Sequence, residues 1–144
     1  MANEITITSK IAATKAGVSI ANATYIVPQT MSTTADDMVL QTQTISFAAE
    51  EKVALGDVNG ASTGDEYFIR LRNMDDTNNC AVKVRTGAAT YQQVGLMRPG
   101  ETWGPVRMQK AAAAAGYEGE IWAQFAVADG LIEVAAVEAG DPAA

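Results

Sequence analysis

The residue types that most often carry out catalysis are sparse in this sequence. There is no histidine, which excludes Ser-His-Asp and Cys-His nucleophile arrangements and every histidine-based metal site. The glycines form neither a Gly-x-Gly-x-x-Gly pattern nor a Walker pattern, so no phosphate-binding loop is indicated. The sequence therefore predicts a protein that is not an enzyme, with no catalytic residues and no cofactor.

Two acidic segments could in principle supply oxygen ligands to Ca²⁺. One is the run Asp75-Asp76-Thr77-Asn78-Asn79, and the other, Asp57-Val58-Asn59-Gly60, is similar to the opening of a calcium loop. Such a loop needs a glycine at its sixth position and a carboxylate at its twelfth. Counted from Asp57, those positions hold Ser62 and Phe68. We therefore predict no metal site and interpret the run 75–79 as a solvated turn.

Three side chains could have either a functional role or a place in the hydrophobic core: Trp103, Trp122 and Cys80. Either indole could stack on a sugar ring, which keeps open a carbohydrate- or receptor-binding β-sandwich. Large apolar side chains are few in this sequence, so anchoring the core is the favoured role for both tryptophans. Cys80 is the only cysteine and alternates with Val82 and Val84, which predicts a buried small hydrophobe.

These side chains must be positioned by β-strands, because apolar residues recur with a period of two far more often than with a period of 3.6. Turn-forming pairs such as Asn59-Gly60 and Asp129-Gly130 separate short apolar runs at intervals typical of sandwiches and barrels. Strands are predicted at 38–46, 51–55, 66–73, 80–86, 90–97, 102–108, 119–127 and 131–138. The predicted fold is all-β, an antiparallel β-sandwich or barrel-like domain, with at most one short helix at 109–116.

Two hairpins have the clearest local signals. The strand that ends at Asn73 leads into a turn rich in Asp and Asn, including Asp75 and Asn78, whose side chains can bond their own backbone. The second hairpin turns at Pro99-Gly100, where proline presets φ and glycine supplies φ > 0, as in a type II turn. We predict that these five residues are structural turn residues.

The first 37 residues differ in composition from the rest of the chain. Ser, Thr, Ala and Gly dominate, Pro28 interrupts the segment, and no strong alternation extends through it. We therefore divide the chain into an extended N-terminal arm at 1–37 and a β-sandwich domain at 38–144. Such an arm would become ordered by adding to the sheet edge of a neighbouring subunit. The contact residues expected on it are Ile5, Ile7, Ile11, Tyr25, Ile26 and Val27.

Charge and hydropathy disfavour two classes of partner, nucleic acids and membranes. With 17 acidic and 10 basic side chains the formal net charge is -7, and Lys and Arg form no cluster for phosphate groups. We expect no nucleic-acid binding. No run approaches the roughly 20 apolar residues of a membrane span, and the first ten residues lack the pattern of a signal peptide. We expect a soluble chain with no membrane partner.

Two turn signatures carry a resemblance to a known group of proteins. Residues 71–78 read aliphatic-x-Asn-x-Asp-x-x-Asn, and residues 97–101 read aliphatic-x-Pro-Gly-Glu. Together with a late strand pair, they resemble small structural proteins of tailed-bacteriophage virions over residues 40–138. The resemblance implies a virion component that is soluble in the host cytoplasm before assembly.

The resemblance does not distinguish one part of the particle from another. The acidic surface, small size and N-terminal arm favour a capsid decoration or cement subunit that binds and stabilises the head lattice. Its expected partners are other copies of itself, a trimer being the usual homo-oligomer, and the major capsid protein. The alternatives are a tail-associated subunit of a tube, ring or fibre, and the carbohydrate- or receptor-binding β-sandwich.

Overall fold

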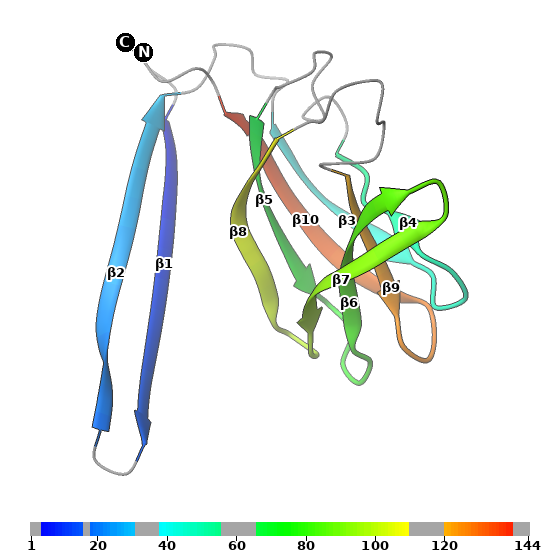
Figure 1. Cartoon of the computed structure of the whole chain (residues 1–144), viewed down its shortest axis with the longest axis horizontal. Coiled ribbons are helices and arrows are strands. Elements are labelled where there is room, and N and C mark those ends of the chain that lie inside the picture. The colour runs from blue at the N-terminus through cyan, green and yellow to red at the C-terminus, as the bar shows by residue number, and fades with distance from the viewer. Residues whose placement is uncertain (1–3, 16–17, 31–37, 56–65, 110–119, 140–144) are drawn as a thin grey trace. The chain divides into compact units, whose positions relative to one another are not determined.

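The described part of the chain is built from β-strands. The computed structural model describes residues 4–15, 18–30, 38–55, 66–109 and 120–139, and no helix occurs among them. The strands are β1 (Glu4–Lys15), β2 (Val18–Thr30), β3 (Met38–Ile45), β4 (Glu51–Lys52), β5 (Glu66–Asn73), β6 (Cys80–Gly87), β7 (Thr90–Met97), β8 (Thr102–Gln109), β9 (Ile121–Phe125) and β10 (Gly130–Ala139) (Figure 1). The predicted all-β fold class is confirmed.

The chain divides into two compact units. The first comprises Met1–Thr33 with Ala139–Ala144, and the second comprises Thr34–Glu138. In the first unit β1 and β2 pair antiparallel as a long hairpin, from Glu4 opposite Thr30 to Lys15 opposite Val18. The N-terminal segment therefore folds back on itself, a pairing that the sequence pattern did not indicate.

The second unit is a sandwich of two four-stranded antiparallel sheets. Sheet I has the strand order β3-β10-β5-β8, and sheet II has the order β4-β9-β6-β7. Each sheet joins strands that are far apart in the sequence, and this order is that of a jelly roll, a double-sheet fold of eight strands. The sandwich alternative of the sequence prediction is therefore correct, and the jelly-roll order adds the topology that turn signals do not contain.

The hydrophobic core lies between the two sheets and is filled by alternate residues of each strand. In β9, Ile121, Ala123 and Phe125 are buried, whereas Trp122 and Gln124 between them are only partly buried. This is the period of two expected of a strand with one face on the core. The largest fully buried side chains come from both sheets and are Tyr67, Phe125, Ile45, Ile69, Leu71, Met97, Ile121, Ile132, Val53, Val82 and Val134.

Cys80 belongs to this core. Its side chain is fully buried, and burial raises the pKa of the thiol to about 11. The prediction of a buried small hydrophobe is confirmed. Since only the thiolate is nucleophilic, the protonated Cys80 is chemically inert at neutral pH.

The observed strands follow the predicted ranges closely within the sandwich. The main differences are β4, which is only Glu51–Lys52, and β9, which begins at Ile121 and ends at Phe125. The helix predicted at 109–116 falls outside the described residues except for Gln109, which is the last residue of β8.

Candidate interaction sites

The outer face of sheet II carries a cluster of charged and aromatic side chains. Trp122 of β9 lies in register with Lys52 of β4 on one side and with Lys83 of β6 on the other. Residues directly opposite one another on neighbouring strands share a face of the sheet. The sheet therefore gathers residues separated by up to 70 positions in the sequence.

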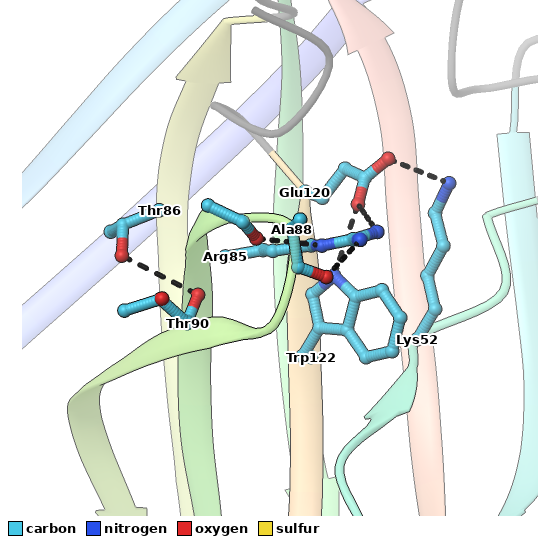
Figure 2. Close-up of polar contacts among 8 residues, drawn as sticks. Lys52, Arg85, Thr86, Ala88, Thr90, Glu120 and Trp122 are labelled. Carbon is cyan, nitrogen blue, oxygen red and sulfur yellow. Dashed lines mark hydrogen bonds and ion pairs between the residues drawn. The ribbon is translucent and has the colours of Figure 1, made fainter.

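Glu120 is the centre of this cluster (Figure 2). The Nζ of Lys52 donates to its Oε1 at 3.3 Å, and the indole Nε1 of Trp122 donates to its Oε2 at 3.1 Å. The guanidinium of Arg85 lies 3.9 Å from the same Oε2. One carboxylate, 20% exposed, thus holds together side chains from β4, β6 and β9.

Arg85 connects the cluster to the turn between β6 and β7. Its Nε donates to the carbonyl of Gly87 at 3.0 Å, and its Nη2 donates to the carbonyl of Ala88 at 2.6 Å. The guanidinium carbon also lies over the Trp122 ring, 5.4 Å from the ring centroid, as in a cation–π contact. Arg85 therefore positions the turn and covers the indole at the same time.

The two tryptophans differ in role. Trp103 packs against the core from β8 and lies so close to Gly95 that a Cβ there would be 2.4 Å from the indole. The prediction of a core anchor is confirmed for Trp103. It is wrong for Trp122, which lies on the outer face with the Tyr91 ring 5.0 Å away, edge to face. The charged neighbours of Trp122 are compatible only with a surface position.

A second polar group lies next to this cluster on the outer face. Lys83 donates to Glu50 at 3.0 Å and to the amide oxygen of Gln124 at 2.7 Å. The hydrogen bond from Lys83 holds the pKa of Glu50 below its ordinary value. A shallow depression of about 290 Å³ opens here, with Lys83, Gln124, Phe47 and Leu96 among its lining residues.

The predicted turn residues after β5 form a buried hydrogen-bond network. The Asn73 side chain is fully buried, and its amide nitrogen donates to the carbonyls of Asn78 at 2.7 Å and Met97 at 3.0 Å. The Asp75 carboxylate accepts from the backbone N–H groups of Thr77 and Asn78. These bonds lower the pKa of Asp75, with Thr77 as the largest cause. The run is a turn, as predicted, but it is only partly solvated, because Asn78 is buried. The predicted hairpin is wrong, since β5 lies in sheet I and β6 in sheet II, and the turn connects the two sheets instead of two paired strands.

The Asn78 side chain extends this network to a third turn. Its amide nitrogen donates to the carbonyl of Ala128 at 2.7 Å, and its oxygen accepts from the N–H of Val127 at 3.2 Å. The turns after β5, β7 and β9 therefore meet at one end of the sandwich. Such a network specifies a unique arrangement because every missing bond would leave a buried polar group unsatisfied.

Pro99 and Gly100 lie in the turn that joins β7 to β8. The predicted turn is present, but the predicted hairpin is wrong, because β7 belongs to sheet II and β8 to sheet I. Gly100 has a φ of 77°, and the N–H of Glu101 donates to the carbonyl of Arg98 at 3.0 Å. This combination corresponds to a type II turn. The N–H of Gly100 also donates to the carbonyl of Asn73 at 3.0 Å, which ties the turn to the buried network.

The six predicted contact residues of the arm all lie in the hairpin. Ile7 is opposite Val27, and the neighbouring pairs place Ile5, Ile11 and Tyr25 at register positions of the same face. Ile26, opposite Thr8, falls on the other face. The pairing thus brings five of the six residues to one side of the hairpin.

Sequence reasoning missed the cluster around Glu120. The alternation in β9 marks positions 120, 122 and 124 as outward, and this signal was present in the sequence. The partners Lys52 and Arg85 come from other strands, and only the register of sheet II brings them to Glu120.

The chain matches no protein-family model, no curated protein and no solved structure. Among the described residues, no helix is long and apolar enough to cross a membrane, and no three His, Cys, Asp or Glu side chains converge as a metal site.

Proposed function

We propose that this chain is a non-enzymatic structural subunit of a bacteriophage virion that decorates and stabilises the capsid lattice. The observation that carries the proposal is the β1–β2 hairpin, a compact unit separate from a complete sandwich. A two-stranded hairpin is marginally stable in water unless further strands or another surface pack against it. Its role is therefore to bind, and the lattice of a particle supplies repeated surfaces to bind to.

Three further observations support the proposal. The jelly roll recurs in viral capsid proteins and in lectins, although a fold alone does not determine a function. The virion setting comes from the two turn signatures, at 71–78 and 97–101. A lectin-like role is disfavoured because the Trp122 ring is already covered by Arg85 and contacted by Tyr91.

The physical mechanism is avidity. A subunit of 144 residues offers each neighbour an interface of modest area, and one such contact is weak. Many copies on a regular lattice hold one another in place, since each bound copy raises the effective concentration of the next contact. The lattice is thereby stabilised although no single interface is strong.

Cryo-electron microscopy of purified particles tests the proposal, with matched particles from which the gene for this chain has been deleted. We expect density for a jelly roll over the capsid lattice of the complete particles only. Density confined to the tail would replace the capsid role by that of a tail-associated subunit. Indistinguishable particles would contradict the structural role altogether.

A further inference from the structure

The sandwich has four edge strands, and three of them carry features that interrupt pairing with another strand. The edges are β3 and β8 in sheet I and β4 and β7 in sheet II. Strand β8 contains Pro105, which has no N–H to donate, and a register shift against β5. Strand β7 has two register shifts against β6, and β4 is only two residues long. Natural sheets block their edges in these ways.

Strand β3 has none of these features. It pairs with β10 over eight consecutive positions, from Met38 opposite Val137 to Ile45 opposite Gly130, without a register shift. Its sequence, Met-Val-Leu-Gln-Thr-Gln-Thr-Ile, contains no proline, no glycine and no charged residue. Leu40 in its middle is 73% exposed. A long, regular, uncharged edge is the kind to which a further strand adds.

The glutamines of β3 bond with the backbone at the neighbouring edge of sheet II. Gln43 donates to the carbonyl of Lys52 at 2.9 Å and accepts from the N–H of Ala54 at 2.8 Å. Gln41 donates to the carbonyl of Ala54 at 3.0 Å. Side-chain amides thus pair the backbone at β4. Among the strands that the structure describes, β3 has a neighbour, β10, on one side only.

The hairpin offers one uninterrupted edge, and it belongs to β1. Strand β2 contains Pro28, which has no N–H to donate. It also carries the extra residue of the register shift, because the step from Ile11 to Ala13 on β1 is matched by the longer step from Ala23 to Ile20 on β2. Strand β1 contains neither proline nor glycine. The edge of β1 is therefore the edge of the hairpin to which a further strand can add without interruption.

We propose that β1 of one copy pairs along the free edge of β3 in a second copy, so that the hairpin extends sheet I of its neighbour. This inference deepens the proposed function, on which it rests, by naming the partner and the strand. The hairpin gains the third strand that it needs for stability, and the exposed edge of β3 is covered. Subunits become linked by main-chain hydrogen bonds.

Cross-linking of the purified full-length chain tests this pairing. Two single-cysteine variants are mixed, Thr8→Cys in β1 and Thr42→Cys in β3, and treated with a flexible bismaleimide. A reagent about 10 Å long tolerates a register offset of two or three residues, because a strand rises about 3.3 Å per residue. The native Cys80 is fully buried and does not compete. The matched control pairs Thr8→Cys with Thr102→Cys, an exposed position on β8 at the opposite edge of sheet I.

We expect a mixed dimer from Thr8→Cys and Thr42→Cys, and loss of that product with Thr102→Cys. Equal yields from both pairs, or no mixed dimer, would overturn the pairing. The double variant Thr8→Cys/Thr42→Cys gives a further check, because linkage only within one chain would show that the hairpin pairs with its own β3. A positive result in solution with no density in the particle would refute the virion role and leave the strand exchange standing.

Discussion

The sandwich and the hairpin differ in how their strands bury apolar side chains and pair their backbone groups. The sandwich buries a core between two sheets and joins three of its turns through Asn73 and Asn78. In the hairpin, β1 and β2 hydrogen-bond with each other and with no other described strand. This difference indicates that stability resides in the sandwich, and it is the basis for assigning the proposed binding of another copy to the hairpin.

The largest expected effect is on the core of the sandwich. Phe125→Ala removes a ring that is 1% exposed and lies against Gly130, where a Cβ would be 2.5 Å from it. We expect the free energy of unfolding to fall by about 3–5 kcal/mol, measured by urea denaturation. Phe47→Ala is the control, because Phe47 is 46% exposed and its loss should cost less than about 0.5 kcal/mol. Equal losses in the free energy of unfolding for the two variants would contradict the position of Phe125 in the core.

The buried turn network gives the next largest effect. Asn73→Ala leaves the carbonyls of Asn78 and Met97 and the N–H of Asp75 without their side-chain partner. Since an unsatisfied buried polar group costs about 1–3 kcal/mol, we expect a loss of about 2–4 kcal/mol in the free energy of unfolding. Asp76→Ala, at an exposed position of the same turn, should change it little. If Asn73→Ala left the free energy of unfolding unchanged, the three turns would be independent of this network.

A smaller, pH-dependent effect is expected on the outer face of sheet II. The pKa of Glu50 is lowered in the folded protein, mainly by the hydrogen bond from Lys83. The ionised Glu50 therefore adds to the free energy of unfolding above its ordinary pKa of 4.5. This stabilisation is lost as the pH falls through the lowered pKa, where the carboxylate becomes protonated. Glu50→Gln should therefore cost at most about 1 kcal/mol at pH 7 and progressively less towards pH 3, in urea denaturation at each pH. A difference independent of pH would contradict the ion pair.

The smallest effect on stability is expected from removal of the hairpin, and this experiment tests the comparison itself. A chain lacking residues 1–33 keeps every residue of the core, so its free energy of unfolding should change by less than about 0.5 kcal/mol. The same truncation should abolish association between copies, measured by sedimentation velocity. Strong destabilisation of the sandwich would show that the hairpin is part of its folding unit.

Much of the sandwich could be predicted from local patterns. Alternation placed Tyr67, Ile69 and Leu71 on one face of a strand, and all three are buried. The pair Pro99-Gly100 indicated its turn because only residues with suitable φ values fit there. The hairpin was not predicted, since Ser, Thr and Ala give weak alternation and the pairing of Glu4 with Thr30 joins residues that carry no strong turn signal between them.

Local patterns are sufficient to predict the strands and most turns, because the period of two and the φ preferences of Gly, Pro, Asn and Asp act over a few residues. The strand order, the Glu120 cluster and the difference between Trp103 and Trp122 arise only in the folded protein. Lys52, Arg85 and Glu120 meet through the register of strands far apart in the chain. The register depends on which strands pair and on which of their faces is buried, and both depend on contacts across the whole sandwich.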